Sequence, residues 1–149
     1  MPTAAQIVCP HCATPNRIRA EHPDGVPKCG SCHQALFTAH ALDVDEAAFE
    51  RHLRLSSIPV LADIWAPWFG PCRAMSPAFE RAAAVLEPGM RLLKLNADTA
   101  PNTCSRLGVR GIPAMFVFHN GTVIGQTAGA MDTGAIVRWA RDQIPADAH

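Results

Sequence analysis

The sequence predicts an α/β fold that follows a small cysteine-rich domain. From about residue 39 onward, apolar residues recur alternately at helical spacing and in strand-like runs, which is typical of a sheet covered by helices. Asn120-Gly121 separates the last two runs and predicts an antiparallel hairpin, which makes the sheet mixed. Four of the six cysteines lie in the first 32 residues. We therefore expect a cysteine-rich domain over residues 1–38 and an α/β domain over residues 39–149, built as a central mixed sheet flanked by helices.

The expected elements follow the order αβαβαββα from residue 43 onward. Asp43, with Glu46 three residues later, resembles a capping box and predicts a helix over residues 45–54. Residues 59–65 are nearly all apolar, as expected of a central parallel strand that is covered on both faces. The remaining elements are expected as helices over 72–87, 100–107 and 133–143, the last capped by Asp132, and as strands over 91–97, 113–118 and 122–127.

Residues 1–35 show neither helical nor strand periodicity. A segment this short buries too little apolar surface to offset its conformational entropy, so it needs a staple. Cys9-Pro-His-Cys12 and Cys29-Gly-Ser-Cys32 supply one, because two pairs at this spacing are typical of a four-cysteine zinc site. Four thiolates leave no open position on the ion. We therefore expect a structural Zn²⁺ in a zinc-ribbon-like domain, with His11 and His33 outside the ligand set.

Other interpretations of the cysteine-rich segment stay open. In one alternative its thiols are free or disulfide-linked, and in another one of the pairs has a redox role. In a third, oxidants eject the metal and the site acts as a redox sensor. Zinc ribbons often contact nucleic acid, but Glu21 and Asp24 offset two of the three basic residues here. No aromatic residue lies between Cys9 and Cys32 to stack on a base. We expect no nucleic-acid partner.

The composition excludes several classes of protein. Thirteen Lys and Arg balance thirteen Asp and Glu, which argues against a general binder of nucleic acid or of acidic membranes. No apolar run approaches the ~20 residues that a membrane-spanning helix needs, so we expect no membrane association. The first residues lack the basic and apolar regions of a secretory signal peptide. We therefore expect a cytoplasmic protein, in which cysteines are kept reduced unless they bind metal or act in catalysis.

Two short motifs indicate the chemistry of the second domain. Asp63-Ile-Trp-Ala-Pro-Trp-Phe-Gly-Pro-Cys72-Arg is followed by Gly111-Ile-Pro113. Together they resemble the thioredoxin family, whose usual motif is Trp-Cys-Gly-Pro-Cys, and the four-cysteine segment narrows the resemblance to the zinc-binding bacterial thioredoxin-2 type. The resemblance covers essentially the whole chain. It implies a thioredoxin fold, reduction of protein disulfides by thiol–disulfide exchange, and a thioredoxin reductase as the source of electrons.

The resemblance also implies a role for each matching residue. Cys72 matches the resolving cysteine, and Asp63 matches the carboxyl that relays a proton to or from it. An aspartate in an apolar strand is costly to bury charged, so its pKa should rise unless it finds a partner. Pro113 matches a cis-proline that pairs with the substrate backbone. The residues expected to contact substrate are Trp68, Gly70, Pro71, Ile112 and Pro113, with Gly129 and Ala130 completing the groove.

One position departs from the family pattern. Phe69 stands where the family has its first, attacking cysteine. Phenylalanine has no sulfur, so no mixed disulfide with a substrate can form at this position. We therefore expect exchange to be very slow or absent. A non-catalytic alternative is a client-binding or holdase module that uses the apolar groove around Trp68, Phe69 and Ile112. Cys104 has no counterpart in the motif and is expected to be a small apolar filler.

Overall fold

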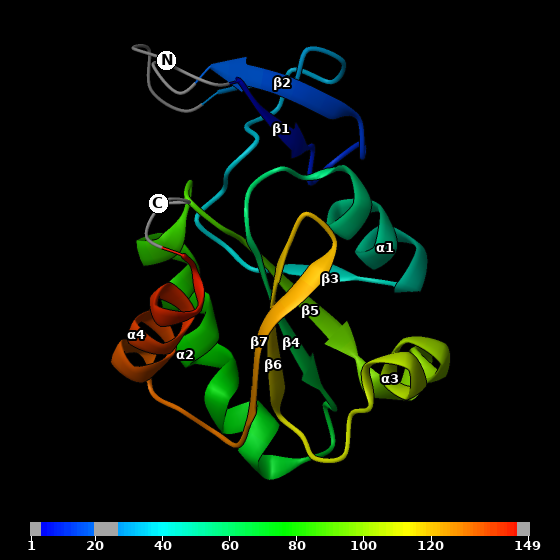
Figure 1. Ribbon diagram of the computed structural model, residues 1–149, viewed down its shortest axis with the longest axis vertical. Coiled ribbons are helices and arrows are strands. Elements are labelled where there is room, and N and C mark those ends of the chain that lie inside the picture. The colour runs from blue at the N-terminus through cyan, green and yellow to red at the C-terminus, as the bar shows by residue number, and fades with distance from the viewer. Residues whose placement is uncertain (1–3, 20–26, 146–149) are drawn as a thin grey trace.

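The computed structural model describes residues 4–19 and 27–145 (Figure 1). The first of its two parts is an antiparallel hairpin of two strands, which belongs to the cysteine-rich arm. The second is a five-stranded mixed sheet flanked by helices, which confirms the predicted fold class. The strands are β1 (Ala4–Val8), β2 (Pro15–Arg19), β3 (Leu42–Val44), β4 (Val60–Trp65), β5 (Arg91–Asn96), β6 (Ala114–His119) and β7 (Thr122–Ala128). The helices are α1 (Glu46–Leu55), α2 (Gly70–Leu86), the 3₁₀ turn η1 (Ala97–Thr99), α3 (Pro101–Leu107) and α4 (Thr133–Gln143).

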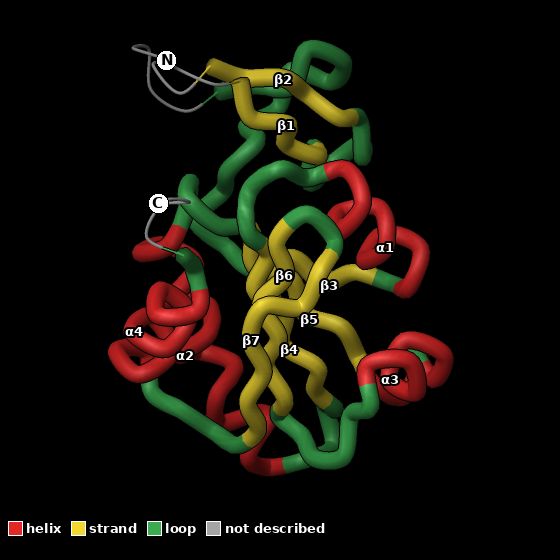
Figure 2. The backbone as a smooth tube through the Cα atoms, viewed as in Figure 1, coloured by secondary structure: helices red, strands yellow, loops and turns green. Residues whose placement is uncertain are grey.

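The large sheet has the strand order β3-β5-β4-β6-β7. Strands β3, β5 and β4 are parallel, whereas β6 is antiparallel to β4 and β7 is antiparallel to β6. Helices α2 and α4 cover one face and α1 and α3 the other (Figure 2). Each face of the sheet has its own apolar core. The core between the sheet and α2 includes Phe79 and Met115, and the core on the side of α1 includes Phe49 and Phe116. No helix in the described ranges is long and apolar enough to cross a membrane.

The structure corrects three expectations. Residues 1–35 show no strand periodicity, so β1 and β2, which pair along five residues each, were not predicted. The short edge strand β3, which pairs with β5, was also missed. Asp43 lies in β3, so it does not cap the following helix. Asp45 does, and its carboxylate accepts a hydrogen bond from the backbone N–H of Ala48 at 2.8 Å. The predicted cap of α4 is confirmed, because Asp132 accepts from the N–H of Ala135 at 2.8 Å.

A buried arginine joins the arm to the sheet. Arg91, the first residue of β5, is fully buried, and its Nη2 donates to the carbonyls of Val8 at 3.1 Å and Leu36 at 2.8 Å. Its Nη1 lies 3.4 Å from a carboxylate oxygen of Glu87, and the guanidinium stacks 4.7 Å from the ring centroid of Phe37. A buried cation is tolerated only when it is paired and hydrogen-bonded in this way. The docked arm therefore completes the surroundings of Arg91.

Further hydrogen bonds hold the arm against the end of α1. The backbone N–H of Ser57 donates to the carbonyl of Gln6 at 2.9 Å, and the N–H of Gln6 donates to the hydroxyl of Ser57 at 2.7 Å. Arg51 donates through Nε to the carbonyl of Ala13 at 2.7 Å. The arm thus lies at one end of the sheet, and the N-terminus of α2 lies at the other (Figure 1).

Replacing Arg91 should loosen this junction. We expect Arg91→Met to lower the free energy of unfolding by about 3–5 kcal/mol, because Glu87 and two arm carbonyls lose their buried partner. Urea denaturation measures the loss. The matched control is Arg106→Met, since Arg106 forms an exposed ion pair with Glu50 whose removal should cost less than about 1 kcal/mol. Equal losses in the two variants would contradict this role of Arg91.

Candidate functional site

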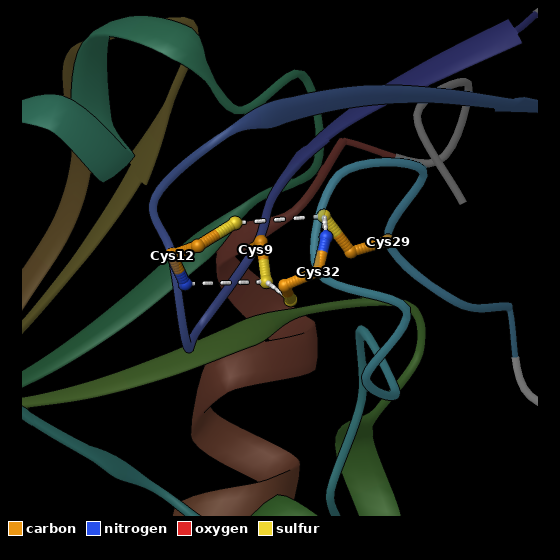
Figure 3. Close-up of side chains that lie close together, drawn as sticks. All are labelled: Cys9, Cys12, Cys29 and Cys32. Carbon is orange, nitrogen blue, oxygen red and sulfur yellow. Dashed lines mark hydrogen bonds between the residues drawn. The ribbon is translucent and has the colours of Figure 1, made fainter.

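Four cysteines of the arm come together in one place (Figure 3). Their sulfur atoms all lie within 4.8 Å of one another. The sulfur of Cys9 lies 3.6 Å from that of Cys32, and the sulfur of Cys12 lies 3.6 Å from that of Cys29. None of these described thiols forms a disulfide. The predicted residues Cys9, Cys12, Cys29 and Cys32 are therefore brought together as one cluster.

Two equivalent turns build the cluster. In each, the residue after the second cysteine, Ala13 or His33, adopts a left-handed conformation, with φ of 64° and 66°. The N–H of that residue bonds back to the carbonyl of the first cysteine, at 3.1 Å and 2.9 Å. This geometry turns the backbone N–H groups inside each turn toward the first sulfur. Cys9 accepts from the N–H of His11 at 3.3 Å, and Cys29 accepts from the N–H of Ser31 at 3.3 Å.

The donors around Cys29 favour a thiolate. The N–H of Cys32, the amide of Asn16 and the N–H of Ser31 lower the pKa of Cys29 to about 6. A tetrahedral zinc with bonds of about 2.3 Å would hold its sulfurs about 3.8 Å apart, which is close to the Cys9–Cys32 and Cys12–Cys29 separations of 3.6 Å. The donor set and its spacing fit a metal ion. His11 and His33 are exposed and lie outside the cluster, as expected.

The second candidate site is the turn between β4 and α2. Phe69 is the N-cap residue of α2, and its side chain is half-buried and makes no capping hydrogen bond. Its N–H bonds to the carbonyl of Ala66 at 3.2 Å. Gly70 and Pro71 form the first turn of the helix, where proline loses no hydrogen bond because the first N–H groups have no partner within the helix. The predicted start of the helix at 72 was therefore two residues late.

Cys72 follows in the first turn of α2 and is closed off from solvent. Its exposed fraction is 0%. Burial raises the pKa of its thiol above the ordinary value, and the nearby carboxyl of Asp63 adds to the effect. A helix N-terminus ordinarily favours a thiolate. Here burial outweighs that contribution and favours the protonated thiol over the thiolate.

Asp63 lies in β4 under α2. Its side chain is buried, and neither carboxylate oxygen has a hydrogen-bond partner within the described residues. Burial raises its pKa to about 7, although Lys94 opposes the shift. This confirms the expected rise in pKa. The carboxyl can therefore gain or lose a proton near neutral pH beside Cys72.

Two neighbours of this site were missed in the sequence. Lys94 pairs in register with Asp63 across β4 and β5, and its Nζ donates to the hydroxyl of Ser76 at 2.7 Å. The same ammonium lies 4.1 Å from the ring centroid of Trp65. The signal in the sequence that could have identified Lys94 was a lysine inside an otherwise apolar strand. Asp98, which accepts a hydrogen bond from Nε1 of Trp68 at 2.8 Å, had no comparable signal because it lies in a turn.

An apolar surface surrounds the turn. Trp68 is 63% exposed, and its ring meets that of Phe69 edge-on at 5.8 Å between centroids. The Ile112–Pro113 peptide bond is cis, in agreement with the resemblance, and the carbonyl of Pro113 accepts from the N–H of Gly129 at 2.8 Å. The loop that carries this bond lies at the same end of the sheet as the start of α2 (Figure 1). Cys104 lies elsewhere, half-buried against the core under α1, as a filler would.

Comparisons with known proteins agree with this geometry. A family model described as Thioredoxin matches residues 40–142. Thioredoxin C-3 of Corynebacterium nephridii is 33% identical over 138 residues, which cover 93% of this chain and 94% of that protein. An alignment of that length includes much of the arm. The thioredoxin of Rickettsia bellii (strain RML369-C) is 34% identical over 104 residues, 70% of this chain and 99% of that protein. A Synechocystis thioredoxin is 39% identical over 88 residues, 59% and 82% of the two chains.

Asp63 should make stability depend on pH. The unfolded carboxyl ionises near pH 3.8, whereas the folded one stays protonated up to about pH 7. Folding therefore holds an extra proton between these values, and the free energy of unfolding should fall as pH rises from 4 to 7. We expect Asp63→Asn to be about 4 kcal/mol more stable than the parent at pH 8, and about equal to it at pH 4.

Denaturation at several pH values tests this expectation. The control is Asp142→Asn, because Asp142 is exposed on α4 and should leave the pH profile unchanged. If Asp63→Asn kept the full pH dependence of the parent, the buried carboxyl would not be its source.

Proposed function

Because the chain belongs to the thioredoxin family, we propose that it is a zinc-binding thioredoxin of the thioredoxin-2 type in which thiol–disulfide exchange is absent or strongly reduced. Its thioredoxin relatives support thiol–disulfide oxidoreductase activity as the function of the family to which the chain belongs. The alignment with Thioredoxin C-3 extends into the arm and supports the narrower type. The observation that carries the loss of exchange is Phe69 at the N-cap of α2.

The reaction needs two sulfurs in sequence. A first thiolate attacks one sulfur of a substrate disulfide and forms a mixed disulfide, and the other substrate sulfur leaves as a thiolate. A second thiolate then attacks the mixed disulfide, which releases the reduced substrate and leaves a disulfide in the enzyme. With Phe69 in the first position, the attacking sulfur is missing. Cys72 has no partner within the turn, so the intramolecular disulfide cannot form.

Cys72 is poorly suited to replace the missing attacker. Attack depends on access and on the fraction of thiolate, and this thiol is fully buried with a raised pKa. In the proposed assignment it keeps the position of the resolving cysteine, and Asp63 keeps that of the proton relay. The substrate-contacting surface consists of Trp68, Gly70, Pro71, Ile112 and Pro113. The implied partners are protein disulfides and a thioredoxin reductase, and the implied location is the cytoplasm.

The four-cysteine cluster is proposed to hold a structural Zn²⁺. Cys9, Cys12, Cys29 and Cys32 would supply four sulfur ligands, and backbone N–H donors to Cys9 and Cys29 favour thiolate charge on these two. The ion supplies cross-linking of the arm when bound and has no open position for a substrate. The arm, over residues 1–38, is thereby held folded against Arg91 at the end of the sheet opposite to Phe69 (Figure 1). The proposed metal site is thus separate from the turn between β4 and α2 that carries Phe69.

Restoring the missing sulfur tests the proposed loss of function. The parent chain should show only background reduction of insulin disulfides in the presence of dithiothreitol, and Phe69→Cys should restore clear turnover. Phe69→Ser is the matched control, because it opens the same space without adding a sulfur able to attack. A folded Phe69→Cys protein that stays inert would overturn the proposed scaffold, and an active parent would overturn the proposed loss.

Metal analysis tests the zinc proposal. Native mass spectrometry should find one zinc per chain, and Cys29→Ala should lose most of the metal because it removes a buried ligand. The protein should also melt at a lower temperature once a chelator removes the ion, since binding free energy is folding free energy for such a site. Cys104→Ala should retain the metal, because Cys104 lies outside the cluster. A metal-free protein with an unchanged melting temperature would refute a structural role.

A non-catalytic client-binding role is the second candidate. The observation that favours it is the exposed indole of Trp68 beside the half-buried ring of Phe69, which together form an apolar surface without a thiol. The parent should then suppress aggregation of reduced insulin chains, and Trp68→Ala should weaken this effect several-fold. Val85→Ala is the control, since Val85 is 49% exposed elsewhere on α2. Equal suppression by all three proteins would exclude the groove as the binding surface.

A further inference from the structure

The side chain of Asn16 connects the two cysteine turns. Asn16 lies in β2, just after the first turn, where it pairs in register with Ile7 of β1. Its Oδ1 accepts a hydrogen bond at 2.9 Å from the backbone N–H of Gly30, which lies in the second turn. Its Nδ2 donates to the sulfur of Cys29 at 3.4 Å and to the carbonyl of Thr14 at 3.0 Å. One amide therefore bonds to both turns.

These contacts fix the orientation of the amide. A backbone N–H only donates, so the atom that faces Gly30 is the oxygen. A backbone carbonyl only accepts, so the atom that faces Thr14 is the nitrogen. The nitrogen carries two hydrogens, and the second one is left for the sulfur of Cys29. The two backbone neighbours thus aim an N–H donor at this sulfur.

The second turn has no counterpart of this amide. In both turns the N–H of the first cysteine bonds to the carbonyl of the residue five positions later, at 2.9 Å. Two positions beyond that residue, the chain has Asn16 after the first turn and Leu36 after the second. Leu36 is fully buried in the apolar core of the arm. Because the second turn forms with leucine at this position, the fold of a turn does not by itself require asparagine.

The sulfur that receives this bond is shielded from water. Cys29 is buried, whereas Cys12, whose sulfur lies 3.6 Å away, is exposed. Four thiolates around one Zn²⁺ keep a net negative charge, which is costly to bury unless hydrogen-bond donors face it. Water can supply such donors to Cys12, but at Cys29 the protein has to supply them. Asn16 adds a side-chain donor there to the backbone N–H groups of Ser31 and Cys32, at 3.3 Å and 3.5 Å.

We propose that Asn16 is a positioning residue of the metal site, which ties the two turns together and stabilises the metal-bound sulfur of Cys29. This inference rests on the proposed zinc site and adds a residue that does not itself bind the ion. The N–H donor acts on the metal through its sulfur ligand, and the bond to Gly30 keeps the second turn beside the first. Replacing such a residue ordinarily lowers metal affinity by about 10- to 100-fold.

Competition with a chelator of known affinity measures the zinc dissociation constant of the full chain. We expect Asn16→Leu, which copies the second turn, to weaken zinc binding by about 10- to 100-fold. Asn16→Asp nearly keeps the shape of the side chain and the acceptor for Gly30, but it puts a carboxylate oxygen in place of the N–H donor. This variant should weaken zinc binding at least about tenfold, because a negative group then faces the sulfur.

Gln34→Leu is the matched control and should bind zinc like the parent. Gln34 is an exposed amide of the same arm, and its side chain forms no hydrogen bond within the ranges that the structure describes. Co²⁺ in place of zinc supplies a second readout, because the energy of the sulfur-to-cobalt absorption rises when N–H donors bond to the sulfur. The band should move to longer wavelength in Asn16→Leu and stay in place in Gln34→Leu.

The outcomes separate this inference from the zinc proposal. A parent chain that binds no zinc would overturn the metal site and this inference together. A parent that binds one zinc, with the same dissociation constant in Asn16→Leu or Asn16→Asp, would overturn the inference alone. An unshifted cobalt band in Asn16→Leu would also overturn it, because the amide would then not act on the sulfur.

Discussion

Thiol–disulfide exchange requires a sulfur anion that a substrate disulfide can reach. In the proposed assignment, this protein keeps the surroundings of the attacking sulfur but lacks the sulfur itself. Phe69 is the N-cap residue of α2 and its ring contacts the exposed indole of Trp68, and the loop with the cis peptide bond before Pro113 lies at the same end of the sheet (Figure 1). Behind it, the thiol of Cys72 and the carboxyl of Asp63 are both buried with raised pKa values. The rest of the proposed function depends on this one side chain.

The two ends of the sheet have separate tasks. One end carries the redox turn, and the other carries the arm with its four cysteines (Figure 1). Arg91 links the arm to β5, because the hydrogen-bond partners of its Nη2 are the arm carbonyls of Val8 and Leu36, whereas its Nη1 pairs with Glu87. Docking of the arm, and with it the proposed metal site, is therefore coupled to the stability of the sheet, whereas the surroundings of Phe69 are set locally. The proposed loss of exchange at one end would leave the other end intact.

The sequence predicted most of the fold because its main elements have clear periodicity. The apolar run of β4 and the capped pattern of α4 were placed to within a residue, and the four cysteines were recognised by spacing alone. Short, half-exposed strands such as β3 have too few residues for periodicity to identify them. The predicted cap of α1 was wrong because both Asp43 and Asp45 precede the helix. The pairing of β3 with β5 places Asp43 in a strand and leaves Asp45 to cap the helix.

Contacts between distant segments could not be predicted. Lys94 lies opposite Asp63 through strand register, and Arg91 bonds to carbonyls of the arm, so both placements depend on tertiary structure. The resemblance, by contrast, identified Phe69 as the decisive departure, although only the structure shows Cys72 fully buried behind it.

The reaction of native Cys72 with oxidised glutathione tests the central claim most directly. Intact mass and peptide mapping of the metal-loaded protein would follow the mixed disulfide at this residue. The account predicts no adduct at Cys72 until the protein is unfolded, because the thiol is buried and protonated. An adduct that forms in the folded protein as fast as at an exposed cysteine would contradict it.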